Sequence, residues 1–424
     1  GSTAAPKSAK KKPKIPVSRV QTHMDGYLGD RIDACIRVRV CSEDPDLLVA
    51  PMRRQTETSL WQSEFWGKWT LGAIASYRYN KDPELLRKIE GGVESLLAAQ
   101  QPDGYIGNYA PEAQLTNWDV WGRKYTMLGL LAYYDLTGDK KALDGAVRLA
   151  DHLLTQIPAV RQIERTGIYR GMSSCSILEP IMLLYNRTLD EKYLDFARYI
   201  VDRMESADGP QLIAKALDGV PVSERFPLDD PSRGWFVWEN GQKAYEMMSC
   251  YDGLLELYKV TNDPRYLKAV EATVTSIIAD EINIAGSGSS FECFYKGKAL
   301  QTEPAYHTME TCVTMTWMKL CYDLLRLTRN PLYADQIERS AYNALAASMK
   351  EDASQIAKYS PLEGARSAGE EQCGMHVNCC NMNGPRAFAL LPEAAVTDYG
   401  DELFVNLYGP MSSTVRLDGG EVLL

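Results

Sequence analysis

The hydrophobic and polar positions of this 424-residue chain follow a repeated pattern of paired helices. In each copy an apolar helical stretch leads into a short polar turn, and an Asp or Asn then precedes a second, amphipathic stretch. Asp and Asn at such positions accept hydrogen bonds from the first backbone N–H groups of a helix, and so they predict where it begins. Five positions fit this pattern: Asp82, Asp139, Asp190, Asp263 and Asn330.

The spacing of these helix starts predicts the overall fold. The capping residues recur at intervals of roughly 50 to 70 residues, which is longer than the period of a short-repeat helical solenoid. Helical hairpins of this length suit a toroid in which inner and outer helices alternate. Five detected hairpins and one degenerate copy predict a mainly α protein, an (α/α)6 barrel with a short C-terminal β region.

The two ends of the chain differ from this helical body. Residues 1–18 are rich in Lys, Ala and Pro and predict a disordered basic arm. Residues 19–395 contain the hairpins and make up the predicted catalytic barrel domain. In residues 396–424, short stretches rich in strand-forming residues are separated by Gly and Pro turns, which predicts β-strands. We expect this last segment to be a small β-sandwich or the start of a truncated one.

Aromatic segments that also contain glycine lie between the predicted hairpins. They are residues 60–69, 100–109, 118–125 and 235–241. Sugars present C–H faces that stack on aromatic rings and hydroxyl groups that need polar partners. Glu64, Trp66, Asp103 and Tyr105 are therefore predicted substrate contacts. The alternative is that the tryptophans of these segments only pack between helix ends.

The composition narrows the kind of partner. A net charge of −10 and a pI near 5.2 argue against nucleic acid, because binding a phosphate backbone needs clustered Lys and Arg. The sequence has no apolar run of about 18 residues, so it predicts no membrane-spanning helix. A neutral or weakly charged small substrate fits better. The expected compartment is the periplasm or the exterior after removal of a signal peptide, with the cytoplasm as the alternative; the oligomeric state stays open.

Three cysteines and one glutamate supply the donor atoms that a zinc ion prefers. Cys379 and Cys380 are adjacent, and Glu310 and Cys312 stand two residues apart upstream. Thiolate sulfur favours zinc, and a carboxylate oxygen can complete a tetrahedral set. Adjacent cysteines form only a strained disulfide. Because turn-forming residues follow at 381–385, the pair predicts a metal clip on a loop.

The spacing of the upstream motif restricts its place on a helix. Residues two apart on a helix point roughly 200° apart, so Glu310 and Cys312 can converge on one ion only at or before a helix start. From the residues alone, a structural zinc site, a catalytic zinc–thiolate site and a site without metal all stay open. His307 and His376 flank the two motifs and are candidates for substrate contact or for hydrogen bonding to the ligands, with a structural role as the alternative.

Several motifs taken together resemble the β-L-arabinofuranosidase superfamily of glycoside hydrolases, families 127 and 146. These motifs are Gln101–Gly107, Glu292-Cys293-Phe294, Glu310-Thr311-Cys312, and Cys379-Cys380 with Asn383 and Arg386. The resemblance extends over residues 20–410 and depends most on the Glu-Thr-Cys and Cys-Cys motifs.

The resemblance implies an (α/α)6 barrel with a zinc ion held by Glu310, Cys312, Cys379 and Cys380. It also implies that Cys379 is the nucleophile and that Glu292 is the acid/base. Zinc coordination deprotonates a thiol at neutral pH, which suits this role. Retaining hydrolysis needs one group to attack the anomeric carbon and a second group to transfer protons.

The predicted function is that of a retaining exo-glycosidase which removes a terminal furanose-type sugar, expected to be β-L-arabinofuranose, from a plant-type glycan. One alternative is an (α/α)-barrel unsaturated-uronide hydrolase or sugar epimerase, in which carboxylates or histidines act and the thiols are incidental. The other alternative is a non-catalytic carbohydrate-binding protein that contains a structural zinc ion.

Overall fold

The computed structural model describes residues 18–228, 230, 232, 241–303 and 305–424. Residues 1–17 of the predicted basic arm lie outside this range, as do residues 235–240 of the last predicted aromatic segment. None of the described helices is both long enough and apolar enough to cross a membrane.

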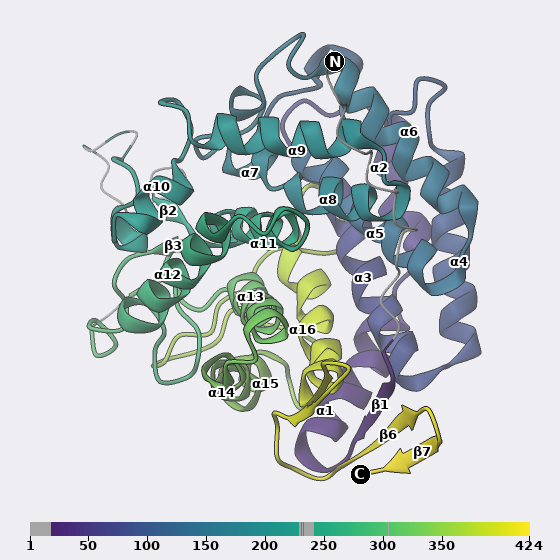
Figure 1. Ribbon diagram of the computed structural model, residues 1–424, viewed down its shortest axis with the longest axis vertical. Helices are drawn as coiled ribbons and strands as arrows, with labels where there is room; N and C mark the ends of the chain where they lie inside the picture. The colour runs from purple at the N-terminus through teal and green to yellow at the C-terminus, as the bar shows by residue number, and fades with distance from the viewer. Residues whose placement is uncertain (1–17, 229, 231, 233–240, 304) are drawn as a thin grey trace, which may run out of the picture.

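In the described part of the chain, six inner helices pack side by side in a closed ring. In ring order they are α3 (Ser63–Asn80), α5 (Asp119–Thr137), α8 (Leu178–Thr188), α11 (Ala244–Thr261), α13 (Thr311–Thr328) and α16 (Cys379–Ala395), which returns to α3. Figure 1 shows α16 near the centre of the molecule, between α13 and α3. The predicted (α/α)6 barrel is therefore confirmed.

The outer helices follow the inner ones in sequence and cover the ring from outside. They are α4 (Pro83–Ala98), α6 (Lys140–Gln156), α9 (Glu191–Met204), α12 (Pro264–Asp280) and α14 (Pro331–Ser340). Their apolar side chains recur at helical spacing on one face, as Ala142, Ala146, Leu149 and Leu153 do on α6. The inner helices are instead buried on most sides; in α5 every residue from Asp119 to Leu131 is buried.

Each hairpin turn follows the predicted capping pattern. Asp82, for example, accepts a hydrogen bond of 3.0 Å from the backbone N–H of Glu84, and the other four predicted residues cap their helices in the same way. The residue that ends each inner helix except α16 takes a left-handed conformation, as Gly138 does with φ +72°. This conformation lets the chain reverse direction within two residues.

The sixth hairpin is formed by the two ends of the chain. Helix α1 (Gly26–Cys35) packs against α16, and α2 (Pro45–Arg54) packs against α3 and α4. Strand β1 (Val20–Met24) pairs antiparallel with β6 (Met411–Leu417), and β6 pairs with β7 (Gly420–Leu423). This sheet lies at the lower edge of Figure 1. The N-terminal and C-terminal segments thus close the ring together.

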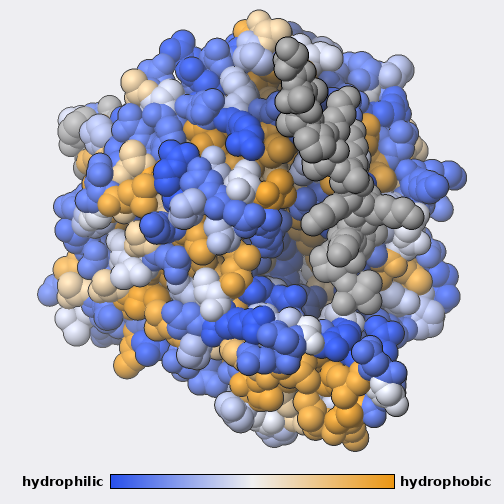
Figure 2. Space-filling model, viewed as in Figure 1, coloured by the Kyte–Doolittle hydropathy of each residue, from blue (hydrophilic) through white to orange (hydrophobic). Residues whose placement is uncertain are grey.

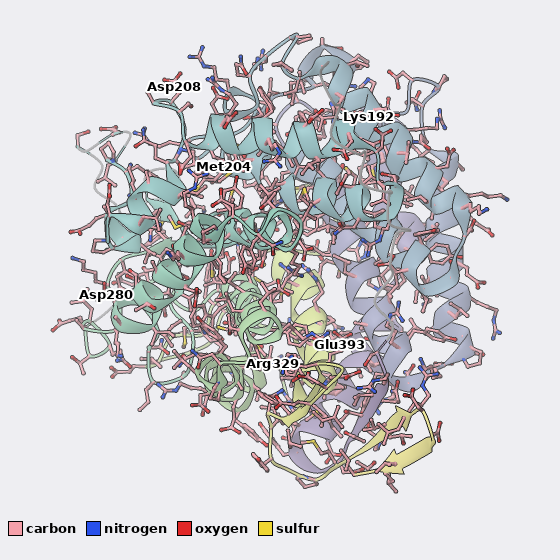
Figure 3. All side chains as sticks on the ribbon, viewed as in Figure 1. Lys192, Met204, Asp208, Asp280, Arg329 and Glu393 are labelled. Carbon is pink, nitrogen blue, oxygen red and sulfur yellow. The ribbon has the colours of Figure 1, made fainter. Side chains whose placement is uncertain are left out.

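Short elements connect the helices. They are α7 (Met172–Cys175), α10 (Leu212–Leu217), α15 (Ala346–Ser348), the paired strands β2 (Gln242–Lys243) and β3 (Cys293–Phe294), and the paired strands β4 (Val396–Asp398) and β5 (Leu403–Val405). Arg329 at the end of α13, labelled in Figure 3, forms ion pairs of 3.0 Å with Asp401 and Glu402 and so ties the turn before β5 to the barrel.

The outer edge of the three-stranded sheet is apolar. Leu417 of β6 and Val422 and Leu423 of β7 are exposed. Figure 2 shows a hydrophobic area over this edge of the molecule.

Candidate active site

Three thiols from two neighbouring inner helices meet at one end of the barrel. Cys312 is the second residue of α13, and Cys379 and Cys380 are the first two residues of α16. The sulfur of Cys380 lies 3.4 Å from that of Cys312 and 3.9 Å from that of Cys379. All three are free cysteines, and their sulfur atoms lie within 4.8 Å of one another. Three donors of this kind can hold one metal ion.

The cysteine pair lies on a helix, which differs from the predicted loop. Asn378 caps α16: its side chain accepts a hydrogen bond from Asn381 N, and the Asn381 side chain accepts one from Asn378 N. This reciprocal cap starts the helix at Cys379, so the residues at 381–385 form its first turns and not a separate turn. Both thiols therefore lie at the positive end of a helix dipole, which favours thiolate charge.

The charge of the thiol cluster is concentrated on Cys379. Hydrogen bonds with Cys312 and Cys380 hold the pKa of Cys379 well below its usual value. Burial raises the pKa of Cys312 and of Cys380. Cys379 is also the partly exposed member of the trio, while the other two are buried. Cys379 is therefore the most acidic thiol of the three; the residue is partly exposed, although its thiol group is itself buried.

Glu310 lies immediately before α13, as the spacing of the Glu-Thr-Cys motif predicts. Its carboxyl group is buried and contacts that of Glu292. Burial, together with the charges of Glu292 and Cys379, raises the pKa of Glu310 well above its usual value. Within the described residues, Glu310 Oε2 has no hydrogen-bond partner. The three thiols lie within 4.8 Å of one another, and Glu310 is not part of that close group. Its buried, unpaired carboxylate oxygen is nevertheless of the kind that can complete a zinc ligand set.

Glu292 stands on a loop that is held in an uncommon conformation. Phe291 and Glu292 both have positive φ, +48° and +65°, which costs about 1–3 kcal/mol for each such residue. The carbonyl of Glu292 accepts a hydrogen bond of 2.9 Å from Ala244 N, and Lys243 Nζ lies 3.3 Å from its Oε1. The Glu292 side chain remains 20% exposed, so it can reach a bound molecule.

Aromatic and charged side chains surround this end of the barrel. Lys68 and Glu64 of α3 form a buried ion pair, and the Lys68 ammonium lies over the rings of Tyr125 and Tyr245. The two tyrosine hydroxyls are hydrogen-bonded to each other, and Tyr245 also accepts from Asn383 of α16 at 3.1 Å. Rings of this kind beside charged groups can bind a sugar.

A further carboxylate on α11, Glu246, lies close to this group. Burial raises the pKa of Glu246 to about 7, and its Oε2 has no hydrogen-bond partner within the described residues. Glu246, Lys68 and Lys243 were not among the site residues predicted from the sequence. The available signal was the presence of charged residues in the first turns of helices that are otherwise apolar.

The four residues predicted from the aromatic segments as substrate contacts have different surroundings in the structure. Glu64 lies near Cys379, whose charge acts on it. Trp66 is fully buried on α3 and donates a hydrogen bond to Gly92 O. Tyr105 is buried and donates to Asp119, and Asp103 pairs with His152. Trp66, Tyr105 and Asp103 are thus engaged in packing or pairing that does not involve the thiols.

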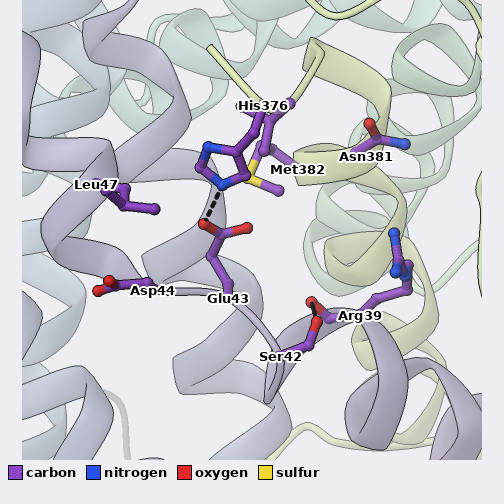
Figure 4. Close-up of a pocket in the computed structure, with 9 residues that line it drawn as sticks. Arg39, Ser42, Glu43, Asp44, Leu47, His376, Asn381 and Met382 are labelled. Atoms are coloured by element: carbon purple, nitrogen blue, oxygen red, sulfur yellow. Dashed lines mark hydrogen bonds and ion pairs between the residues drawn. The ribbon is translucent and has the colours of Figure 1, made fainter.

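The two histidines have different surroundings. His307 packs against the rings of Phe291 and Tyr359, beside Glu292. His376 instead donates a hydrogen bond of 2.6 Å to Glu43. The side chains of His376 and Glu43 point toward each other in a pocket of about 290 Å³ (Figure 4), which Arg39, Asp44, Asn381 and other residues complete. His307 therefore lies near the candidate acid/base, and His376 ties the loop before Cys379 to the segment before α2.

A second acidic group in the barrel interior already surrounds a lysine ammonium. Glu179 of α8, Asp252 of α11 and Asp323 of α13 bring their carboxylates together. The ammonium of Lys319 lies 2.6, 3.3 and 3.1 Å from them, respectively. This lysine occupies the position that a cation would take, so the group is an internal ion-pair network.

The fold and the site together define a class: an (α/α)6 barrel with a thiol–carboxylate centre where its inner helices begin. Residues 30–393 match the model of the family described as β-L-arabinofuranosidase, GH127 catalytic domain. The chain belongs to this family of glycoside hydrolase catalytic domains, which confirms the resemblance derived from its motifs.

Individual relatives agree with this assignment. A non-reducing end β-L-arabinofuranosidase from Bifidobacterium longum subsp. longum is 22% identical over 322 residues, covering 70% of this chain. The chain spans 47% of that relative, about half its length. A GH127 β-L-arabinofuranosidase from Geobacillus stearothermophilus T6 superposes with a TM-score of 0.71 at 22% identity, over 95% of this chain and 70% of that one.

A second solved structure has the same fold. The GH127 β-arabinofuranosidase BT3674 superposes with a TM-score of 0.69 at 21% identity, over 96% of this chain and 67% of that one. At this level of identity the similarity shows a shared barrel, so the chemistry has to be argued from the residues of this chain.

Proposed function

We propose that this protein is a retaining exo-glycosidase that releases a terminal furanose-type sugar, with β-L-arabinofuranose as the expected sugar, from a plant-type glycan. The observation that carries the proposal is the asymmetry of the thiol cluster. Its partly exposed member, Cys379, has the lowered pKa, and Glu310 of the adjoining helix contacts the accessible carboxylate of Glu292.

The reaction has two steps. In the first step the Cys379 thiolate attacks the anomeric carbon and the glycosidic C–O bond breaks, while Glu292 gives its proton to the leaving oxygen. The product of this step is a thioglycoside on Cys379. In the second step Glu292 takes a proton from water, the water oxygen attacks the same carbon, and the thiolate leaves. Two displacements at one carbon retain its configuration.

Glu310, Cys312, Cys379 and Cys380 would hold a zinc ion. A bound zinc ion keeps coordinated thiols deprotonated at neutral pH. The protein supports the same charge state through the N-termini of α13 and α16, both of which point at the sulfur atoms. Lys243, in contact with Glu292, holds that carboxylate beside the thiolate.

The test is turnover of an aryl β-L-arabinofuranoside by Cys379→Ala. We expect at least a thousand-fold loss of kcat with an unchanged fold, because no second group can form the covalent intermediate. Cys373→Ala is the matched control, since Cys373 is also a partly exposed free cysteine and lies in the loop just before α16. Full activity of Cys379→Ala would exclude the nucleophile assignment.

Product analysis distinguishes the proposed glycosidase from the two alternative functions. NMR can monitor which anomer of the sugar is released. If the β-anomer appears first, the configuration at the anomeric carbon is retained. An unsaturated-uronide hydrolase or an epimerase would act on a panel of uronides or free sugars and survive loss of Cys379. A carbohydrate-binding protein would bind the glycan without releasing any sugar, and Glu292→Gln would leave its affinity unchanged.

A further inference from the structure

Lys358, in the segment before α16, has a backbone that is fixed next to the thiols. Its N–H donates to Ser367 O at 2.7 Å, and its carbonyl accepts from Thr311 N, the first residue of α13, at 3.0 Å. The carbonyl also lies 3.8 Å from the Cys380 sulfur. The backbone of Lys358 is therefore tied to the helix start that carries Cys312.

The aliphatic stem of Lys358 has room because its neighbour is a glycine. A Cβ atom at Gly369 would lie 2.7 Å from Cδ and 2.9 Å from Cβ of Lys358, closer than side-chain carbons approach. The glycine thus lets the stem lie flat against the loop. The whole residue is only 7% exposed. A lysine held in this way presents its ammonium group at a defined place.

That ammonium group differs from those of two other buried lysines at this end of the barrel, Lys68 and Lys243. Lys68 is paired with Glu64, and Lys243 is paired with Glu292. Within the residues that the structure describes, Lys358 Nζ has no oxygen or sulfur acceptor at hydrogen-bond or ion-pair distance. Its contact is with the face of the Tyr359 ring, 5.3 Å from the centroid.

The surroundings of Lys358 keep it charged without satisfying its donors. Burial lowers the pKa of Lys358, but the charges of Cys379, Glu310 and Glu292 outweigh this effect and raise it. An ammonium carries three N–H donors, and leaving them unpaired in a largely buried place is unfavourable. The neighbouring anions therefore compensate the charge. Nζ is not among the buried atoms that lack a partner, so water reaches it, and a bound molecule can replace that water as the acceptor.

We infer that Lys358 is a substrate-binding residue, whose ammonium donates hydrogen bonds to hydroxyl oxygens of the sugar that Cys379 attacks. The inference deepens the proposed glycosidase function and depends on it. Sugar hydroxyls are the acceptors of matching chemistry, because they are neutral and do not add to the negative charge of the thiol and carboxylate groups. Lys358 is thus a specificity-determining residue of the proposed reaction.

The experiment compares Lys358→Met with the wild type on an aryl β-L-arabinofuranoside. Methionine keeps the length of the stem and removes the donors. We expect KM to rise about 10- to 100-fold, the range of charge-assisted hydrogen bonds, with a smaller change in kcat. Lys350→Met is the control, because Lys350 is an exposed lysine of the same segment.

A second readout distinguishes sugar binding from an electrostatic role. Zinc content and the rate at which iodoacetamide alkylates Cys379 should stay unchanged in Lys358→Met. If these two change while KM does not, Lys358 acts on the thiols and the inference is overturned. An unchanged KM, zinc content and alkylation rate overturns it as well.

Failure of the proposed glycosidase function can be distinguished from failure of the inference about Lys358. If the wild type turns over no furanoside, calorimetry with L-arabinose and a panel of pyranoses replaces kinetics. Weaker binding of a sugar by Lys358→Met then supports Lys358 as a sugar-binding residue in a protein that is not this glycosidase. Equal binding by variant and wild type, or no binding by either, overturns the assignment of Lys358.

Discussion

The Nζ atom of Lys243, on β2, lies 3.3 Å from Oε1 of Glu292, the residue just before the facing strand β3. Lys243 is buried and its ammonium also lies over the Tyr169 ring, so it has little freedom to move. This contact fixes the carboxylate that the proposed mechanism uses for proton transfer.

Replacing Lys243 by Gln should therefore lower kcat about 10- to 100-fold while changing KM much less, because the lost interaction positions Glu292 and does not bind sugar. The measurement is steady-state kinetics on an aryl β-L-arabinofuranoside. Lys296→Gln, an exposed lysine of the same loop region, serves as the control. Equal kcat values for the two variants would show that Glu292 needs no such support.

The metal ligand set predicts a defined zinc content. Purified protein should contain about one zinc ion per chain by elemental analysis, and Cys312→Ser and Glu310→Gln should each lose most of it, because a tetrahedral site needs all four donors. Chelation should lower the thermal midpoint, since the bound ion stabilises only the folded state. Cys41→Ser is the control, and a metal-free wild type would contradict the site.

The ion-pair network in the barrel interior predicts a large stability effect. Lys319→Met leaves three carboxylates from three inner helices without their shared cation. The expected loss is about 3–5 kcal/mol of unfolding free energy, typical of breaking a buried ion pair from one side. Urea denaturation measures this loss.

The matched control for Lys319 is on the surface. Lys192 on α9, labelled in Figure 3, pairs with Asp151 at 3.1 Å, and both side chains are exposed. Lys192→Met should cost at most about 1 kcal/mol. Equal costs for the two variants would mean that the interior network is as well solvated as the surface pair.

Glu281, at the end of α12, predicts a pH dependence of stability. Burial raises the pKa of Glu281 to about 7, although its carboxylate accepts hydrogen bonds from Tyr295 N and Lys296 N. The folded state thus binds this proton more tightly than the unfolded state, whose Glu titrates near 4.3. The stability that this group contributes is fully present below about pH 4.3 and is lost as pH rises through about 7.

The size of this effect is roughly 3 kcal/mol for a shift of this kind. Urea denaturation between pH 4.5 and pH 8 measures it, and Glu281→Gln should flatten the dependence, because glutamine stays neutral and its carbonyl oxygen still accepts. A variant with the wild-type slope would show that other groups control the pH dependence.

The sequence by itself determined where the helices of this protein begin and how the hairpins follow one another. Asp82, Asp139, Asp190, Asp263 and Asn330 are helix caps in the structure, because a short side-chain acceptor stabilises a helix start whatever packs around it. The helix period and the hairpin spacing then predicted the barrel. The Glu-Thr-Cys and Cys-Cys motifs indicated the family and the thiol cluster, because the types of metal-donor residues and their spacing are properties of the sequence alone.

Only the tertiary structure decided how the ring closes and what surrounds the thiols. The pairing of β1 with β6 joins residues almost 400 positions apart, and no local pattern specifies such a partner. Residues 381–385 suggested a turn, yet they lie in α16, because the reciprocal cap between Asn378 and Asn381 starts a helix at Cys379. Gly384 is needed there for packing, since a Cβ at this position would lie 2.6 Å from Ile356. The roles inferred for Lys243 and Lys358 likewise depend on contacts across the barrel, since charge and burial belong to the assembled site and not to a segment.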